Sequence, residues 1–594
     1  MLKPTRILSI HILAAGSVAS AQPTTFQDAQ QGALQTLEMA FGMVGGAAAG
    51  DFDNDGDCDL FVASGLRSDS LILVNDGSGN LTPRTITTPA GPAHNDRAGL
   101  WVDYDADADL DLLVFADNHR QDVPTEATNL RLFRNDKGNF TEVTAQAGLY
   151  RLLEDPFAGT EGFLAHGSGL LAADFNNDGA IDIYATFWSG RNYLFQNNAN
   201  GTFTDITPST GMQSFTTHWQ PGAVDLDRDG DMDIVQPVDF TNNKVFRNNG
   251  NGTFTDIAPQ LGMNNAMNDM GIAIGDPDND QDFDIFITNI HDAFTPMSDL
   301  QGRHNVFYRN NTQGFSLSFS EDSEEARVDK GDWGWGCTFV DIDHDGWQDL
   351  AQTNGFNVNP ARGFATDRTR LFSNSDRGIR FTEVAQQTLC DDDDIGSCYI
   401  SLDIDSDGDR DLFQVCQFAP PRLRLNELES SAVDRGWLTI KPRSVVPGSS
   451  GQANSYAIGA VVRVTHASPD GPRTQSRLIT AGTSLLGQEP AEAHFGLGQG
   501  VHEAMVVRVE WPSGQVTTHP NMRADRNITL VDASVTSPDL NRDGLLNQAD
   551  LTLAETVPFD ITGDRVYDKH DIRAVRSAVT MRIRVPEALI HGGG

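Results

Sequence analysis

The chain has 594 residues, with 42 basic and 83 acidic side chains and a formal net charge of −41. So acidic a chain is repelled by nucleic acids and by anionic membrane surfaces, which excludes both as expected partners. Because 39% of the residues are apolar, we expect folded domains and not an acidic disordered chain.

The first 21 residues have the pattern of a secretory signal peptide. Lys3 and Arg6 precede an apolar run over 7–15, and Ala19-Ser20-Ala21 provides an A-x-A cleavage site. The apolar run is too short to span a membrane, and no later stretch reaches about 18 apolar residues. The sequence therefore predicts export, with the mature protein secreted or at the cell surface and no membrane span.

A nine-residue acidic motif begins at residue 51 and occurs seven times; its copies are called loops one to seven. Aspartates stand at positions 1, 3, 5 and 9, except for Asn176 at position 3 of the third copy, and glycine usually stands at position 6. Ca²⁺ takes 6–8 oxygen ligands, and glycine permits the tight turn. An apolar strand-like run follows position 9, so the motif predicts structural calcium loops between β-strands and not EF-hands. The predicted ligands are Asp51, Asp53, Asp55 and Asp59; Asp103, Asp105, Asp107 and Asp111; Asp174, Asn176, Asp178 and Asp182; Asp225, Asp227, Asp229 and Asp233; Asp276, Asp278, Asp280 and Asp284; Asp341, Asp343, Asp345 and Asp349; and Asp403, Asp405, Asp407 and Asp411.

Each loop lies in a longer repeat that predicts four short strands. A small, Gly-rich strand precedes the loop and an apolar strand follows it. Next comes Leu-Phe-x-Asn, as at 132–135, and after a Gly/Asn turn Phe-Thr-(Asp/Glu)-(Ile/Val), as at 203–206. Four-stranded units at a period of about 50 residues are typical of propeller blades. We therefore expect a mainly β protein with a seven-bladed β-propeller over 22–428, in which the segment around Phe26 supplies the missing outer strand of the last blade.

These repeats resemble the FG-GAP/VCBS family, the propeller type of integrin α-subunits. The resemblance rests on the seven acidic loops and covers about two-thirds of the chain. It implies the propeller fold more specifically than it implies a function.

Loops two and five depart from the motif. Ala108 and Gln281 replace the turn glycine, and a non-glycine residue there strains the backbone by about 1 kcal/mol. We therefore expect these two loops to bind calcium most weakly.

Five cysteines are an odd number, so at least one is unpaired within the chain. Cys390 and Cys398 flank an acidic turn and are candidates for a local disulfide. Cys58 and Cys416 stand among strand residues, where buried free thiols are the more ordinary interpretation.

Residues 436–533 predict a small all-β domain without acidic cages, with strands over 437–441, 457–464, 475–480, 506–509 and 527–531. This segment is similar to the ASPIC/UnbV domain, which follows FG-GAP repeats in the cartilage acidic protein family and its bacterial relatives. The resemblance implies a secreted acidic binding protein with no established chemistry. The single histidine of the motif, His494, has no patterned partner, and we interpret it as structural. The matching residues are Ile458-Gly459-Ala460, Ser484, Gln488, His494-Phe495-Gly496-Leu497-Gly498 and Trp511-Pro512-Ser513-Gly514.

Residues 537–580 predict a small α-helical calcium module, followed by an uninformative tail over 581–594. The first of its two loops has EF-hand spacing, and the second has Arg565 where glycine belongs. Paired loops of this kind resemble a dockerin, which would bind a cohesin-like module; the alternative is a calcium-stabilised cap. The predicted ligands are Asp539, Asn541, Asp543, Asn547 and Asp550 in the first loop, and Asp560, Thr562, Asp564, Asp568 and Asp571 in the second.

The sequence contains no zincin helix, nucleophile elbow, P-loop or Rossmann fingerprint, and it predicts no catalytic residue. We expect an exported, calcium-rigidified adhesion or binding protein with a protein or polysaccharide ligand. The alternative is a carbohydrate-active enzyme or a scaffold-attached component that processes polysaccharides, because propellers host many activities.

Overall fold

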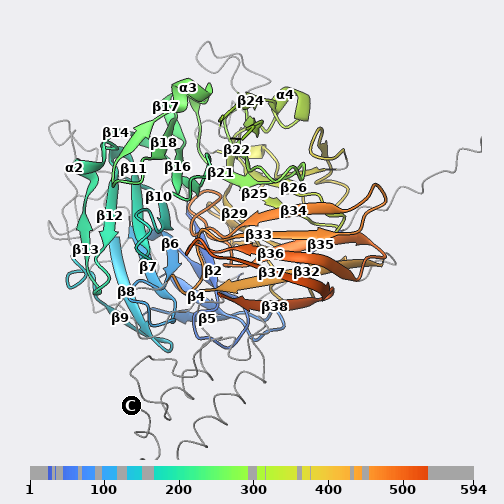
Figure 1. Cartoon of the computed structure of the whole chain (residues 1–594), viewed down its shortest axis with the longest axis horizontal. Helices are drawn as coiled ribbons and strands as arrows, with labels where there is room; N and C mark the ends of the chain where they lie inside the picture. The colour runs from blue at the N-terminus through green and yellow to red at the C-terminus, as the bar shows by residue number, and fades with distance from the viewer. Residues whose placement is uncertain are drawn as a thin grey trace, which may run out of the picture.

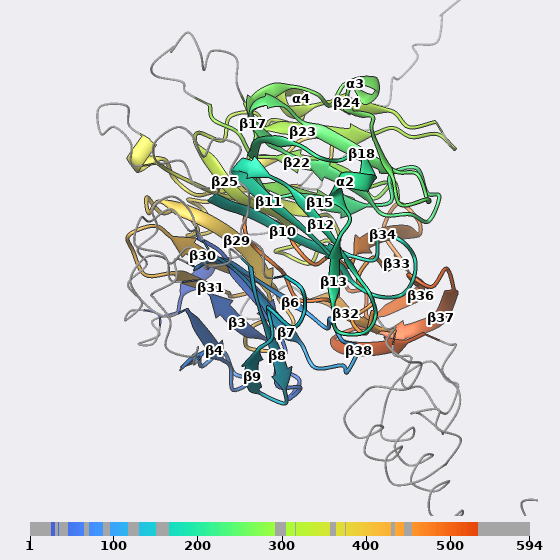
Figure 2. The ribbon, with the colours of Figure 1, turned by 90° about the vertical axis from the view of Figure 1, so that its left-hand side faces the viewer.

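The computed structural model shows a mainly β protein (Figures 1 and 2). Among the described residues, no helix reaches the length and hydropathy needed to cross a bilayer. The predicted signal peptide, the C-terminal calcium module and the tail lie outside the described part of the chain. The structure describes residues 25–29, 34, 45–63, 70–86, 96–116, 130–149, 166–291, 304–314, 316–356, 364–374, 376–428, 434–444 and 454–532.

Seven antiparallel units of four strands follow one another, as the repeat predicts. In six of them the four strands pair in the order in which they occur along the chain. In the seventh, β1 pairs with β31, so that Phe26 lies opposite Asn426. The outer strand of the last unit therefore comes from the beginning of the chain, which confirms the prediction for Phe26. The units are β2 (Ala47–Gly50), β3 (Asp59–Val62), β4 (Leu71–Val74) and β5 (Thr82–Thr85); β6 (Asp96–Val102), β7 (Asp111–Ala116), β8 (Leu130–Asp136) and β9 (Asn139–Glu142); β10 (His166–Ala173), β11 (Asp182–Arg191), β12 (Tyr193–Asn197) and β13 (Phe203–Asp205); β15 (Gly222–Val224), β16 (Asp233–Gln236), β18 (Lys244–Asn248) and β19 (Phe254–Asp256); β21 (Ile272–Gly275), β22 (Asp284–Ile287), β23 (Val306–Asn310) and β24 (Phe319–Glu321); β25 (Gly334–Val340), β26 (Asp349–Asn354), β27 (Arg370–Ser373) and β28 (Thr382–Glu383); and β29 (Gly396–Leu402), β30 (Asp411–Cys416) and β31 (Arg422–Asn426) with β1 (Phe26–Asp28).

The first strands of the units contact one another in cyclic order. Strand β2 contacts β6, and the series continues through β10, β15, β21, β25 and β29, which in turn contacts β2. No sheet of the described chain closes on itself; it is the series of units that returns to its start. The first strands are rich in Gly and Ala, which lets their backbones approach closely.

The third unit carries an extension that the repeat does not predict. Strands β14 (Phe215–His218), β17 (Val238–Asn242) and β20 (Ala266–Asn268) continue its sheet beyond β11. Single turns of helix follow three of the fourth strands, and a 3₁₀ turn follows β26: α2 (Thr207–Thr210), α3 (Ala258–Leu261), α4 (Ser323–Ala326) and η2 (Phe364–Thr366).

The C-terminal domain consists of two sheets, in the strand orders β35-β32-β38 and β34-β33-β36-β37. In both views its orange and red strands lie against one side of the repeat units (Figures 1 and 2). One hydrophobic cluster runs through both parts, since Trp101 and Phe115 of the repeats belong to the same cluster as Leu485 and Phe495. The strands are β32 (Arg435–Arg443), β33 (Val461–His466), β34 (Arg473–Leu478), β35 (Ala493–Gln499), β36 (Glu503–Glu510), β37 (Val516–Arg523) and β38 (Arg526–Val531).

Two details of the predicted C-terminal domain were wrong. The strand predicted from residue 457 begins only at Val461, because Ala457 (φ 51°) and Gly459 (φ 94°) adopt left-handed turn conformations. Strand β37 was missed; its alternation places Thr517 and His519 inside, and these polar residues hide the apolar pattern of a strand.

The predicted disulfide between Cys390 and Cys398 is also wrong, since both cysteines are free and buried. The Cys390 sulfur lies 3.8 Å from the Tyr399 hydroxyl, so it faces one side of β29. Neighbouring residues of a strand point to opposite faces, and Cys398 therefore points to the other side, toward Gly487. Of the two cysteines interpreted as buried free thiols, Cys416 is free and buried as predicted, whereas Cys58 is free but half-buried.

Candidate metal centres

Each of the seven acidic loops connects the first strand of a unit to its second strand. Position 9 is the first residue of the second strand and is buried in all seven units, as Asp59 is in loop one and Asp411 in loop seven. Position 1 follows the first strand and folds back on the turn. Asp51 accepts hydrogen bonds from the backbone N–H groups of Asp55 and Gly56, both at 3.1 Å. The loops are therefore compact turns in which the carboxylates at positions 1 and 9 are directed inward.

The carboxylate at position 9 is fixed by two backbone donors. One oxygen accepts from the N–H of position 2, at 2.9 to 3.4 Å in six loops. The other accepts from the N–H of the asparagine in Leu-Phe-x-Asn, at 2.6 to 2.9 Å in all seven units. Sequence reasoning found this asparagine as part of a repeat but missed that it holds the loop.

The same asparagine also connects neighbouring units. Its side-chain amide donates to the carbonyl of position 2 in the preceding loop, at 2.7 to 2.9 Å in six units. Asn75 of the first unit makes this bond with Ile404 of loop seven, across the junction between the last unit and the first. The regular spacing of the asparagine is the sequence signal that could have revealed its role.

The carboxylates fit a divalent cation. In loops one, two, four, five and six, three carboxylates each place an oxygen within 4.8 Å of the others. Several carboxylate oxygens of the seven loops are buried without a hydrogen-bond partner, among them those of Asp53, Asp105, Asp227 and Asp403. A buried, unpaired carboxylate oxygen is costly, and a hard cation satisfies it.

Burial raises the pKa of many loop carboxyls, and the neighbouring carboxylates add to the effect. The pKa of Asp51 is raised to about 6, mainly by burial and then by Asp55. Burial raises the pKa of Asp59, Asp182 and Asp233 to about 8. Without a cation these loops therefore compete for protons near neutral pH.

Loops two and five carry the backbone strain that their sequence predicts. Ala108 has φ 73° and Gln281 has φ 77°, where five loops have glycine. The C-terminal domain contacts both strained residues: the Tyr456 hydroxyl donates to the Ala108 carbonyl at 3.3 Å, and Arg463 Nη1 donates to the Gln281 carbonyl at 3.1 Å. That these loops bind calcium most weakly stays a prediction.

A second recurring site was missed by sequence reasoning. Residues 480–489 of the C-terminal domain, called the hub segment, contact the first strand of every unit or the residues just before it. Gln488 exchanges two hydrogen bonds with the backbone of Trp101, at 2.6 and 2.9 Å. Ser484 exchanges backbone bonds with Ile272, and Leu486 N–H donates to Gln220 before β15. The other contacts join Ala481 to Ala172, Gln488 to Ala47 and Ala49, and Glu489 to Thr338 and Ser401.

His494 is structural in its surroundings, as predicted. It is buried, its Nε2 lies 3.1 Å from the Gly408 carbonyl, and its ring centroid lies 5.0 Å from that of His344. Burial and the neighbouring His344 lower the pKa of His494 well below its usual range, so the imidazole is neutral.

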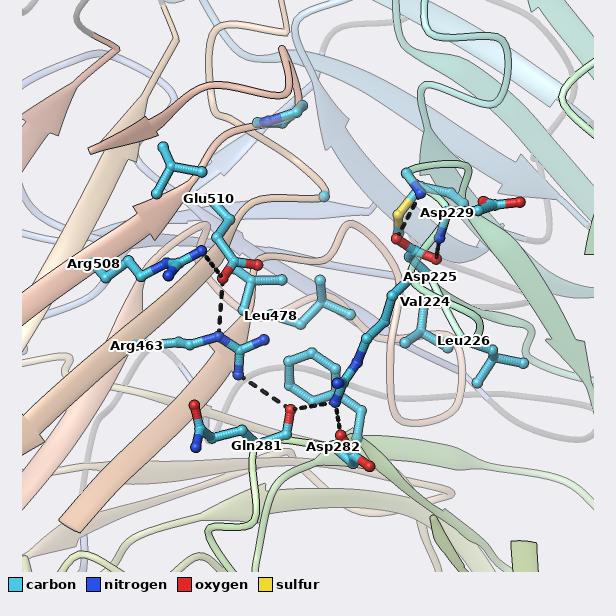
Figure 3. A pocket seen from close by; sticks show the side chains of 18 of the residues that line it. Val224, Asp225, Leu226, Asp229, Gln281, Asp282, Arg463, Leu478, Arg508 and Glu510 are labelled. Carbon is cyan, nitrogen blue, oxygen red and sulfur yellow. Dashed lines mark hydrogen bonds and ion pairs between the residues drawn. The ribbon is translucent and has the colours of Figure 1, made fainter. Parts of the chain in front are cut away.

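A cavity lies between the two parts of the molecule (Figure 3). It is a cleft of about 1020 Å³, with loops four and five on one side and the face of β33, β34 and β36 on the other. Val224, Leu226 and Leu478 provide an apolar floor. Arg463 and Arg508 both pair with Glu510 at the rim, at 3.1 and 3.2 Å. The predicted ligands Asp225 and Asp229 also line the cleft.

Comparison with known proteins supports parts of this organisation. Residues 51–114 and 174–235 match a family model described as FG-GAP-like repeat, and residues 449–537 match one described as ASPIC and UnbV. These matches confirm the two resemblances for the parts of the chain that they cover.

The chain is weakly similar to cartilage acidic protein 1. It is 25% identical to the Xenopus tropicalis protein over 370 residues, which cover 61% of this chain and 44% of the relative. It is also 25% identical to the Homo sapiens protein over 371 residues, covering 61% and 43%. The match thus spans less than half the length of these relatives. Among solved structures, the chain is similar to a crystal structure of BBS1N in complex with ARL6DN, soaked with lead. The sequence identity is 10%, the match covers 68% of this chain and 97% of that chain, and the TM-score is 0.39.

Proposed function

We propose that this chain is an extracellular, calcium-stabilised binding protein whose seven units form a seven-bladed β-propeller. The cyclic contacts of the first strands support the propeller, as do the pairing of β1 with β31 and the bond from Asn75 to loop seven. A hub segment that reaches all seven units fits the centre of such an arrangement. The signal-peptide pattern at residues 1–21 supports export.

Calcium is the cation that this donor set suits best, and its role is structural. Positions 1, 3, 5 and 9 offer carboxylate oxygens, with one amide oxygen from Asn176 in loop three, and an all-oxygen donor set favours Ca²⁺ over softer metals. The observation that carries the proposal is the recurrence of buried loop oxygens with no hydrogen-bond donor. A bound ion would satisfy those oxygens and offset the repulsion within each loop, and so would hold the first and second strands of a unit together.

The binding role follows from the make-up of the chain. The FG-GAP-like and ASPIC/UnbV models are not models of enzyme families, so we propose interaction and not catalysis. The cleft between the repeats and the C-terminal domain has an apolar floor and a rim of paired charges, which is the make-up of a protein-interaction surface. We propose this cleft as the place where a protein or polysaccharide ligand binds. Attachment to a cohesin-like module through residues 537–580 stays a prediction.

Removal of calcium tests the proposal. Each site contributes about 2.7 kcal/mol when calcium is at 100 times its Kd, so several filled loops contribute a large part of the stability. We expect EGTA to lower the melting temperature by more than 10 °C and native mass spectrometry to find several bound calcium ions. A protein that melts at the same temperature with EGTA and with 1 mM calcium would refute the calcium proposal.

A further inference from the structure

Loop five also gathers three carboxylates, those of Asp276, Asp278 and Asp280, but a protein cation already lies against them. Arg309, the variable residue of the Leu-Phe-x-Asn motif in β23, places Nη1 2.5 Å from the position-3 carboxylate of Asp278. The same nitrogen lies 3.9 Å from the position-9 carboxylate of Asp284. The Arg309 side chain is only 14% exposed. Its guanidinium therefore bridges the two ends of the loop, which is where a calcium ion would act.

The position-9 carboxylate of loop five lacks the donor that holds it elsewhere. In the other six loops the N–H of position 2 donates to this carboxylate. Loop five has Pro277 there, and proline has no N–H. One oxygen of Asp284 is consequently buried without a hydrogen-bond partner. Arg309 supplies the positive charge that this oxygen faces.

Two further arginines hold the turn of loop five (Figure 3). Arg228 of loop four pairs with Asp282 and donates to the Gln281 carbonyl at 3.3 Å. Arg463 of the C-terminal domain donates to the same carbonyl at 3.1 Å. These bonds hold the strained residue that replaces the turn glycine, and they join loop five to the C-terminal domain.

Loop six provides the closest comparison and differs in the decisive points. Arg435 lies 2.8 Å from Asp343, also at position 3. Loop six nevertheless keeps its turn glycine, Gly346, and the Ile342 N–H donates to Asp349 at 3.1 Å. An arginine that pairs only with the position-3 carboxylate therefore leaves the rest of a calcium loop intact. Arg309 instead spans positions 3 and 9 of a loop that has lost the turn glycine and the N–H of position 2.

We propose that loop five is held by arginines in place of calcium, and that it is a calcium-independent anchor for the C-terminal domain. Arg309 replaces the ion between Asp278 and Asp284, and Arg228 and Arg463 fix the turn. A charge-assisted pair within the protein needs no free ion, so this contact persists when calcium is removed. The inference rests on the proposed function, because it distinguishes loop five from loops that do bind calcium.

Hydrogen exchange of the full chain, followed by mass spectrometry, tests the proposal loop by loop. Peptides covering 174–182 (loop three) and 276–284 (loop five) are compared in 1 mM calcium and in EGTA. We expect exchange in loop three to accelerate at least tenfold in EGTA and exchange in loop five to change less than twofold. If loop five accelerates as much as loop three, this inference is wrong while calcium binding stands. If neither loop responds, the calcium proposal fails and this inference fails with it.

A substitution provides an independent test by native mass spectrometry. Arg309→Gln removes the guanidinium and leaves the carboxylates, so we expect this variant to bind one more calcium ion than the wild type. Arg134→Gln is the matched control, because Arg134 has the same motif position in β8 but pairs with Asp136 outside the loop, at 2.9 Å; it should bind the wild-type number. An unchanged number in Arg309→Gln would overturn the proposal. Because Arg309 also contacts Asp322, this variant can unfold, and the wild-type exchange experiment then decides alone.

Discussion

Replacing Gln488 by leucine should destabilise the repeats and the C-terminal domain together. The Gln488 side chain is buried in the hub segment, and its amide exchanges two hydrogen bonds with the backbone of Trp101 in β6, at 2.6 and 2.9 Å. Leucine has a similar size and can make neither bond. Gln488→Leu therefore leaves the N–H and the carbonyl of Trp101 buried and unsatisfied.

The expected cost follows from those two groups. A buried donor or acceptor left without a partner costs about 1–3 kcal/mol, so two of them cost about 4 kcal/mol in total. The hub segment belongs to one domain and Trp101 to the other, and a single hydrophobic cluster includes both. The loss should therefore appear in the unfolding of both parts and not in the C-terminal domain alone.

Urea denaturation in calcium, followed by tryptophan fluorescence and far-UV circular dichroism, measures this cost. We expect both signals to move to a lower midpoint by the same amount. Gln499→Leu is the control, because Gln499 is exposed at the end of β35 and its loss should change stability by less than 0.5 kcal/mol. A cost below 1 kcal/mol for Gln488→Leu, or a shift confined to one of two separate transitions, would refute the role of the hub segment.

Three further predictions concern the acidic loops. Burial raises the pKa of Asp59 to about 8, from about 3.9 in an unfolded chain, so its contribution to stability is full below pH 4 and is lost as the pH rises through about 8. The melting temperature of the calcium-free protein should therefore be lower at pH 8 than at pH 5.5, and a flat profile would contradict this. Ala108→Gly relieves a φ of 73° and should raise the free energy of unfolding by about 1 kcal/mol in urea denaturation, whereas Gly230→Ala, at φ 95°, should lower it; no difference between them would argue against strain. Asn75→Ala and Asn135→Ala should each cost about 2–4 kcal/mol by the same measurement, and a much smaller cost for Asn75→Ala would indicate an open junction between the first and last units.

The repeat units could be predicted from the sequence because their determinants are local. The acidic loop, the Leu-Phe-x-Asn strand and the Phe-Thr-Asp strand lie within about 50 residues of one another and recur. Seven copies also exposed the incomplete last unit, and therefore the role of Phe26. The extension formed by β14, β17 and β20 occurs in one unit only, and no second copy marks it as a structural element.

The hub segment could not be predicted, because its partners are distant in the sequence. Gln488 bonds to Trp101, 387 residues away, and Leu486 bonds to Gln220, 266 residues away. Residues 480–489 have neither the period of a strand nor that of a helix, since they pair one or two residues at a time with different units. The indirect signal was the small residues in the first strands and just before them. A Cβ on Gly46 would lie 1.9 Å from the Leu486 carbonyl oxygen, so glycine is needed for the close approach of this segment.

The asparagines imply that order in one acidic loop depends on its neighbour. Asn135 is bonded to two loops. Its backbone N–H donates to Asp111 of loop two, and its side-chain amide donates to the Phe52 carbonyl of loop one. An ion that fixes Asp111 therefore also restricts loop one through Asn135, and the same connection recurs in five other units. Calcium binding should consequently be cooperative between adjacent loops. A loop whose order comes from arginines transmits the same restraint without an ion, so loop five would give the series one fixed member at every calcium concentration.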